Sequence, residues 1–176
     1  MINDEIIEKI ISASQINKED LVIEIGPGLG TLTLKLLENA GKVIAIELDT
    51  NMIKILKDRF NLYDNFIILN EDVLKVDLKE LISKYSNKER KVKVVANLPY
   101  YITTPIIMKL LEDKINIDSI TVMVQKEVAD RITAIPGDKL SGAITYSVNY
   151  YAEANNIAFV DKNSFMPVPE VDSEVI

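Results

Sequence analysis

The sequence predicts an α/β protein built on a mostly parallel sheet of about seven strands, and three observations carry this prediction. Short apolar runs alternate with segments of helical periodicity, which favours parallel strands joined by right-handed crossovers. A glycine-rich turn over residues 26–30 joins the first apolar run to a helical segment. The last two apolar runs lie too close together for a helical crossover, so they should form an antiparallel edge pair.

Five strands should alternate with helices along the first part of the chain. A stripe of isoleucines predicts a helix over residues 2–14. The expected strands are residues 21–25, 42–47, 66–70, 92–96 and 119–124. The expected helices begin at Thr31 and then cover residues 50–60, 78–85 and 104–112, the last with Thr104 as N-cap and Pro105 at the first helical position.

The remaining segments are less regular. The charged run 86–91 predicts a solvated loop. Helices are expected over 126–134 and 142–151, and the two late strands over 156–160 and 171–176. The chain stops inside an apolar, strand-like run, so we expect it to be part of a longer protein.

Composition excludes several classes of protein. A chain of 176 residues with 48% hydrophobic and 27% charged residues is typical of one soluble domain. The sequence has no apolar run long enough to span a membrane and no signal peptide, so a cytoplasmic location is expected. The absence of Cys and His argues against zinc hydrolases and Ser-His-Asp enzymes, and no metal site is expected. The net charge of −7 is unfavourable for a nucleic-acid-binding protein.

The tetrapeptide Asn97-Leu98-Pro99-Tyr100 follows an expected strand, at the end where open α/β sheets bind ligands. Pro99 favours an extended Leu98, which should turn the Leu98 carbonyl outward. The side-chain carbonyl of Asn97 is a second acceptor. Two adjacent acceptors suit the exocyclic amine of adenine, and Tyr100 offers a face on which a base can stack. The alternative is a local turn capped by Asn97.

Three further candidate sites fall at strand ends. Gly26, Gly28 and Gly30 would let the backbone approach a ligand at a helix N-terminus, although such a turn serves NAD, FAD or S-adenosylmethionine alike. The turn departs from the G-x-G-x-x-G pattern, because Thr31 takes the place of the third glycine.

The other two sites are single carboxylates. Glu47 closes the second strand and could accept hydrogen bonds from ribose hydroxyls. Asp72 follows the third strand and could accept from an adenine amine. Each could instead be a surface or capping residue. Together with the glycine turn and the tetrapeptide, they are expected to line one edge of one sheet.

Six segments, taken in order, resemble the ribosomal RNA adenine dimethyltransferase family over nearly the whole chain. These segments are Glu24–Gly30, Glu47–Asp49, Glu71–Asp72, Asn97–Tyr100, Gln125–Val128 and Phe165–Ser173. Leu98 and the Phe-x-Pro-x-Pro-x-Val-Asp-Ser run are more similar to the small-subunit enzymes than to the large-subunit enzymes that confer macrolide resistance.

The resemblance implies a class I (Rossmann-like) methyltransferase fold with S-adenosyl-L-methionine as methyl donor. It implies dimethylation of two adjacent adenosines near the 3′ end of small-subunit rRNA, in ribosome biogenesis. The partner would be that rRNA or a pre-assembled small ribosomal subunit, and no membrane partner is expected. The protein would be a monomer. Residues 1–176 would form the catalytic domain, without the helical C-terminal domain and the initial Gly-Gln-Asn-Phe-Leu-like segment of relatives.

The resemblance also implies roles for individual residues. The cofactor would be bound by Glu24, Gly26, Gly28, Gly30, Glu47 at its ribose, Leu48, Asp72 at its adenine, Val73 and Asn97. The target base would be bound by Asn97, Leu98, Pro99, Tyr100 and Phe165, the last either closing the face opposite Tyr100 or serving as a hydrophobic plug. Lys126 would lie near the RNA-binding surface.

Three other functions remain open at this point. One is a large-subunit rRNA dimethyltransferase, or another adenine or glutamine methyltransferase. The second is an oxidoreductase that binds NAD with the glycine turn, which Thr31 disfavours. The third is a non-catalytic ribosome-assembly factor. Glu170 stands where relatives commonly have Lys, which, with the net charge of −7, lowers the RNA affinity expected of this chain.

Overall fold

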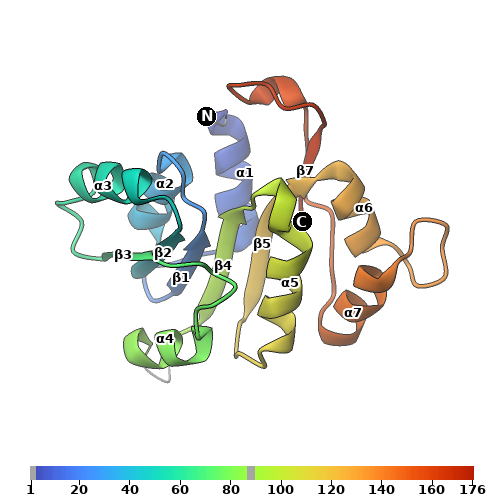
Figure 1. Ribbon diagram of the computed structural model, residues 1–176, viewed down its shortest axis with the longest axis horizontal. Coiled ribbons are helices and arrows are strands. Elements are labelled where there is room, and N and C mark those ends of the chain that lie inside the picture. The colour runs from blue at the N-terminus through green and yellow to red at the C-terminus, as the bar shows by residue number, and fades with distance from the viewer. Residues whose placement is uncertain (1–2, 87–89) are drawn as a thin grey trace.

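A computed structural model describes residues 3–86 and 90–176 and shows one seven-stranded sheet in the order β3-β2-β1-β4-β5-β7-β6 (Figure 1). The strands are β1 (Leu21–Ile25), β2 (Lys42–Glu47), β3 (Phe66–Asn70), β4 (Val92–Asn97), β5 (Ser119–Gln125), β6 (Ala158–Val160) and β7 (Ser173–Val175). The first five strands are parallel, and β7 lies antiparallel between β5 and β6. The predicted mostly parallel sheet with an antiparallel edge pair is therefore confirmed.

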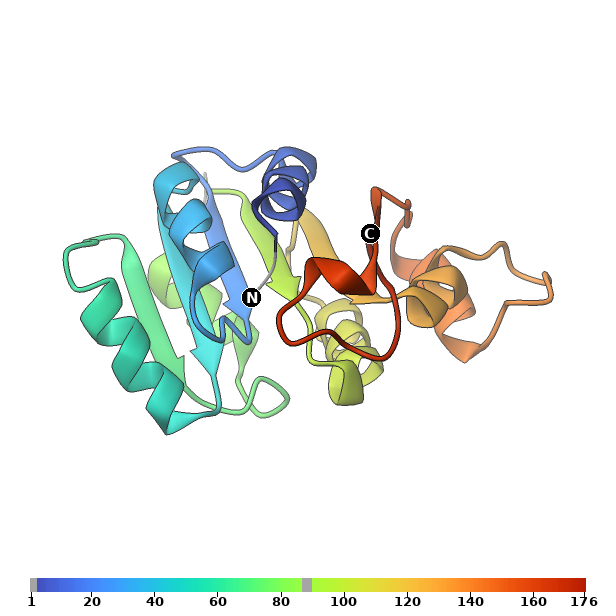
Figure 2. The same cartoon turned by 90° about the horizontal axis from the view of Figure 1, so that it is seen from above.

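Helices cover both faces of the sheet. They are α1 (Asp4–Ser14), α2 (Thr31–Asn39), α3 (Thr50–Arg59), α4 (Leu78–Tyr85), α5 (Thr103–Glu112), α6 (Lys126–Thr133) and α7 (Ala143–Tyr151). Helices α1 to α3 pack with Val22, Val43 and Val95 of the sheet, whereas α4 to α7 pack with alternate strand residues such as Ile23 and Val94. Figure 2 shows α1 and α5 on opposite sides of the strands. None of the helices in the described residues is long and apolar enough to cross a membrane.

The alternation of strand residues decides which face each side chain meets, because successive side chains point to opposite sides. Leu21, Ile23 and Ile25 of β1 belong to the core under α4 to α7. Glu24 therefore points to the side of α1 to α3, together with Val22. On β4 the same rule places Asn97 on that side as well.

Most predicted boundaries agree with the structure, and the differences have local causes. The two late strands are shorter than predicted, because only residues 158–160 and 173–175 pair in the sheet. The expected loop 86–91 and the expected first helix include residues 87–89 and 2, which lie outside the described residues.

The prediction that Thr104 caps α5 and that Pro105 is its first residue is wrong, because α5 begins two residues earlier, at Thr103, with Ile102 as its N-cap. A 3-10 turn over Tyr100–Ile102 leads into the helix, and the Thr103 hydroxyl donates to the Pro99 carbonyl at 2.9 Å. Pro105 thus lies inside the first helical turn, where a missing N–H costs no intrahelical hydrogen bond.

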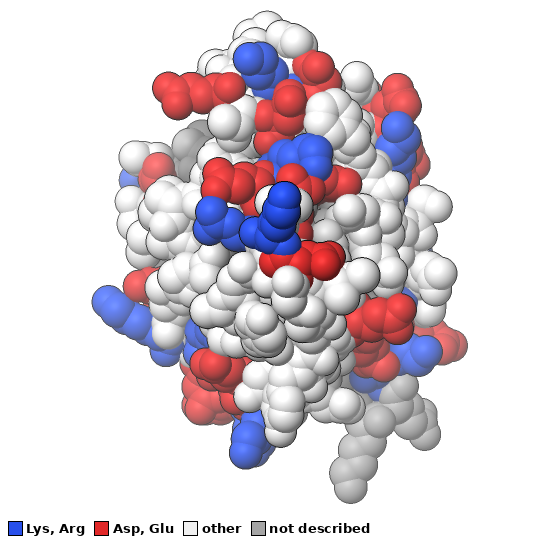
Figure 3. Space-filling view, turned by 90° about the vertical axis from the view of Figure 1, so that its right-hand side faces the viewer, with Lys and Arg blue, Asp and Glu red and all other residues white. Residues whose placement is uncertain are grey.

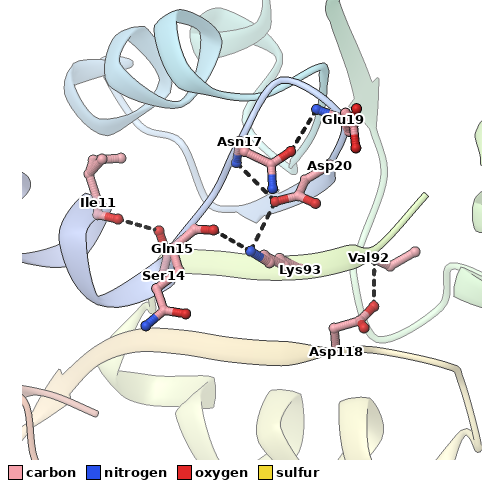
Figure 4. A network of polar contacts seen from close by, with 9 residues as sticks. All are labelled: Ile11, Ser14, Gln15, Asn17, Glu19, Asp20, Val92, Lys93 and Asp118. Carbon is pink, nitrogen blue, oxygen red and sulfur yellow. Dashed lines mark hydrogen bonds and ion pairs between the residues drawn. The ribbon is translucent and has the colours of Figure 1, made fainter. Parts of the chain in front are cut away.

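A buried ion pair fixes the connection between α1 and β1 (Figure 4). The Lys93 ammonium on β4 lies 2.9 Å from Asp20 Oδ2, and both residues are buried. The same ammonium donates to the Gln15 carbonyl, while Asp20 Oδ2 also accepts from the Asn17 backbone N–H at 2.9 Å. The buried ammonium of this strand lysine is therefore held by two acceptors from the segment that joins α1 to β1.

Gly30 has no room for a side chain. It precedes α2 with φ of 80°, a left-handed conformation that favours glycine. A Cβ atom built on Gly30 would lie 2.6 Å from the Phe60 ring and 2.7 Å from Leu56. The glycine turn is thus packed tightly against α3 at this end.

Gly28 provides a matched comparison, because its φ is also positive, at 55°, but a Cβ there would meet nothing within 4 Å. We expect Gly28→Ala to cost only the left-handed strain, about 1–2 kcal/mol, and Gly30→Ala to cost about 2–5 kcal/mol in free energy of unfolding. Urea denaturation of the two variants without added ligand measures both values. Equal losses would contradict the packing of Gly30 against α3.

Candidate active site

The carboxyl ends of the parallel strands bring the predicted site residues to one edge of the sheet. The register pairs Glu24 of β1 with Ala45, Glu47 of β2 with Asn70, and Asn97 of β4 with Met123. Because these strands all run in the same direction, the turns that follow them leave the sheet on the same side. Figure 1 shows the segment before β7 at this end too, near the start of α5.

The glycine turn is in contact with both neighbouring motifs. The Gly26 N–H donates to the Ile46 carbonyl at 3.0 Å, and a Cβ on Gly26 would lie 3.6 Å from the Pro99 ring. Glu47 Oε2 accepts from the Gly28 N–H at 3.4 Å, and its Oε1 accepts from the Asp49 N–H at 2.9 Å. The turn, the carboxylate and the tetrapeptide therefore form one continuous surface.

The end of β3 is tied to the same surface. The Glu71 N–H donates to the Glu47 carbonyl at 3.1 Å. Asp72 Oδ1 accepts from the Leu74 N–H at 3.0 Å, so this carboxylate also shapes its own turn. Leu48 is exposed, whereas the Val73 side chain is buried in the main core.

The tetrapeptide presents two acceptors that have no partner. Within residues 3–86 and 90–176, the Asn97 side chain makes no hydrogen bond and the Leu98 carbonyl accepts none. The Leu98 N–H donates to the Met123 carbonyl at 3.1 Å, and the Leu98 side chain is buried, which together fix this backbone. Asn97 is the last residue of β4 and not, as expected, the first one after it.

The two aromatic residues assigned to the target base differ in their surroundings. The Tyr100 hydroxyl lies 2.7 Å from Ser173 Oγ on β7. Phe165 is partly buried and packs against the core under α1 to α3, which agrees with a plug but leaves part of the ring exposed. Ser173 had no assigned role, although it ends the last of the six family segments.

Glu24 is a buried carboxyl group beside the glycine turn. It is 1% exposed, and its Oε2 atom has no hydrogen-bond partner among the described residues. Burial raises the pKa of Glu24 to about 8, the nearby Thr33 hydroxyl lowers it by a smaller amount, and the Glu47 carboxylate raises it further. Glu24 is therefore mostly protonated at neutral pH.

Charged side chains of both signs are mixed on the face that carries α6 and α7 (Figure 3). Lys126 pairs with Asp130 at 2.6 Å and with Glu174 at 3.3 Å, and Arg131 pairs with Glu127. The hydrogen bond to Asp130 contributes most to raising the pKa of Lys126. A phosphate at Lys126 would thus compete with two carboxylates.

Comparisons with known proteins agree with this arrangement. The model of the family described as "Ribosomal RNA adenine dimethylase" matches residues 1–176. Two curated relatives are named "Ribosomal RNA small subunit methyltransferase A". The one from Lachnoclostridium phytofermentans is 54% identical over 177 residues, and the one from Clostridioides difficile is 51% identical over 176. Each alignment covers 100% of this chain and 61% of the relative, so the chain spans about three fifths of their length.

Two solved structures are similar over almost the whole chain. A dimethyladenosine transferase from Plasmodium falciparum has a TM-score of 0.85 at 34% identity and covers 99% of this chain, which in turn covers 61% of that protein. The 23S rRNA methyltransferase ErmE has a TM-score of 0.82 at 27% identity, and the match covers 98% of this chain and 66% of the ErmE chain. The predicted Rossmann-like methyltransferase fold is confirmed.

The raised pKa of Glu24 predicts a pH dependence of stability. The ordinary pKa is 4.5 and the folded value about 8, so between these values the unfolded chain has released a proton that the folded chain retains. The contribution of Glu24 to the free energy of unfolding is therefore fully present below the unfolded pKa. It falls as pH rises from there towards the folded pKa, by up to about 1.4 kcal/mol per pH unit.

Glu24→Gln should remove that decline, because an amide resembles the protonated carboxyl and does not titrate. Urea denaturation at a series of pH values from 5 to 8 measures the difference between variant and wild type. The exposed Glu112→Gln is the control, and we expect it to retain the decline. Parallel stability profiles for Glu24→Gln and wild type would show that Glu24 is ionised in the folded protein.

Proposed function

This chain belongs to the ribosomal RNA adenine dimethylase family, and we propose that it is the catalytic domain of an enzyme that dimethylates two adjacent adenosines near the 3′ end of small-subunit rRNA. The observation that carries the proposal is the pair of acceptors at Asn97 and Leu98, which have no partner among the described residues and directly precede Pro99, whose ring lies against the glycine turn. The names of the relatives favour the small subunit. Relatives are longer than this chain, and their remaining length would supply further RNA contacts.

The residues present fit S-adenosyl-L-methionine as the methyl donor. A Cβ on Gly28 would meet only open space, so a ligand can approach this backbone closely. The Glu47 carboxylate accepts from the Gly28 and Asp49 N–H groups and still has lone pairs for ribose hydroxyls. The buried Glu24 lies just before the glycine turn. The exposed Leu48 offers an apolar surface for the adenine ring, and Asp72 would accept from the adenine amine.

The cofactor, when bound, supplies a methyl group on a positively charged sulfur. The chain's own part is to make the adenine amine nucleophilic, because its lone pair is delocalised into the ring. Asn97 Oδ1 and the Leu98 carbonyl would each accept one N–H of the amine, which favours a pyramidal nitrogen with its lone pair free. Holding the amine nitrogen in line with the methyl group of the cofactor would lower the activation barrier of the transfer, because the two groups need not meet by chance.

The target base must leave its stack to reach these acceptors. Tyr100 would stack on one face of the base, and Phe165 would close the other. Once methylated, the amine is acidic and loses its proton to water, so no strong base is required. A chain without His or Cys can carry out this reaction.

The remaining assignments rest on the same proposal. The RNA partner would be small-subunit rRNA, free or within a pre-assembled subunit, and the protein would act as a monomer in the cytoplasm. The mixed charges around Lys126 indicate that this face contributes little affinity for RNA by itself. Segments beyond this chain would then carry much of the basic surface.

Cofactor choice is tested by calorimetric titration of the purified protein with S-adenosylmethionine and, in parallel, NAD. We expect saturable binding of S-adenosylmethionine, weakened by Glu47→Ala and by Asp72→Ala because each removes an acceptor. Binding of NAD alone would overturn the proposed activity in favour of an oxidoreductase.

The acceptor pair is tested by Asn97→Ala. We expect methyl transfer to small ribosomal subunits to fall by at least about 10²-fold, since the amine loses one of its two positioning contacts. Binding of S-adenosylmethionine should stay within a few fold, as measured by the same titration. Asn39→Ala at the end of α2, where the amide only donates to the Lys35 carbonyl, is the matched control.

Mass spectrometry of the RNA product identifies the substrate. Dimethyladenosine in small-subunit rRNA supports the proposal, whereas product in large-subunit rRNA would replace it with the large-subunit activity. Normal turnover by Asn97→Ala would contradict the acceptor pair whichever subunit is modified.

A further inference from the structure

We propose that Ser173 is a positioning residue for the target base, because its hydroxyl holds the Tyr100 ring in the orientation on which the base stacks. The inference rests on the proposed function and concerns how the site is assembled. The two hydroxyl oxygens lie 2.7 Å apart, although the residues are 73 positions apart in the sequence. This contact joins the tetrapeptide after β4 directly to the antiparallel edge of the sheet.

Ser173 is a rigid anchor. It is fully buried, and its position in β7 pairs it with Gln125 of β5 on one side and with Val160 of β6 on the other. A serine side chain has a single rotatable bond to its oxygen, so a backbone held from both sides leaves Oγ few positions. The partner of Tyr100 is therefore part of the sheet itself and not of a loop.

The Tyr100 ring is held at both ends. At its backbone, the Pro99 carbonyl accepts from the Ile102 N–H at 3.2 Å and from the Thr103 hydroxyl at 2.9 Å, which fixes the turn. At its far end, the hydroxyl meets Ser173. The adjacent Tyr101 is 80% exposed, so the two neighbouring tyrosines differ in how far the protein surrounds them.

The hydroxyl of Tyr100 calls for a separate explanation, because a phenylalanine ring would stack on a base equally well. A half-buried tyrosine hydroxyl needs a hydrogen-bond partner, and Ser173 supplies it. A ring that is already oriented loses less conformational freedom when the base arrives. The hydroxyl pair thus prepares the stacking surface before substrate binds.

The residue that precedes β7 also helps to place the other aromatic residue of the site. Asp172, next to Ser173, accepts from the Lys126 N–H through its carbonyl and from the Lys162 N–H through Oδ1, both at 3.0 Å. These bonds fix the two ends of the segment that carries Phe165. Anchoring Tyr100 to Ser173 therefore sets the position of one aromatic face relative to the other.

The test compares Ser173→Ala, Tyr100→Phe and the double variant in the full-length protein. Ser119→Ala is the matched control, since Ser119 is also a sheet serine but its buried hydroxyl has no partner among the described residues. Readouts are kcat and KM on small ribosomal subunits, affinity for S-adenosylmethionine, and fluorescence of 2-aminopurine placed at the target position of an RNA fragment. Thermal melting checks that each variant is folded.

We expect each single variant to lose about 10-fold in kcat, with cofactor affinity unchanged and weaker quenching of 2-aminopurine. The double variant should be no worse than either single one, because both changes remove the same contact. Tyr100→Phe keeps the ring and alters no strand, so an equal loss there cannot come from misfolding of β7.

Wild-type kcat and quenching in Ser173→Ala, or losses that multiply in the double variant, would overturn the positioning role while leaving the proposed function intact. Absence of rRNA methylation by the wild type would overturn the proposed function, and this inference with it. The two failures are therefore distinguishable in one set of measurements.

Discussion

The parallel pairing of β1 with β2 and β4 is the constraint on which the site depends. Each of these strands ends in a polar residue or turn, and none of these groups is near another in the sequence. Parallel hydrogen bonding aligns their carboxyl ends, so Gly26 comes to lie against Pro99 and the Gly28 N–H reaches Glu47. A slip of one residue in any pair would turn the aligned side chains to the opposite face of the sheet.

Groups in the site fall into two classes according to their hydrogen bonds within the protein. The carboxylates of Glu47 and Asp72 already accept backbone hydrogen bonds, which hold their orientation but leave further lone pairs free. Among the described residues, neither the Asn97 side chain nor the Leu98 carbonyl has a hydrogen-bond partner. The fold thus orients the two carboxylates, whereas on the proposed function the acceptor pair would gain its hydrogen-bond partners from the target amine.

Sequence patterns predict what is local and miss what is distant. Apolar runs located the five parallel strands, because a strand that is buried on both faces needs a nearly continuous apolar stretch, and glycines located the turn before α2. The N-cap at Thr104 was predicted wrongly, since the 3-10 turn after Pro99 moves the helix start to Thr103. The chain's own family segments contain Ser173, yet only folding shows that it meets Tyr100. Glu24 likewise reads as one polar residue in a strand, and its raised pKa follows from tertiary burial.

The ion pair of Lys93 and Asp20 has a consequence for how the protein can change over generations. Loss of either partner alone leaves a buried charge uncompensated, at a typical cost of about 3–5 kcal/mol, which is a large part of the stability of an ordinary domain. Replacement of both by well-packed apolar residues can be nearly neutral. Single-step mutation therefore meets a barrier that the double change does not, and the two positions should be inherited or replaced together.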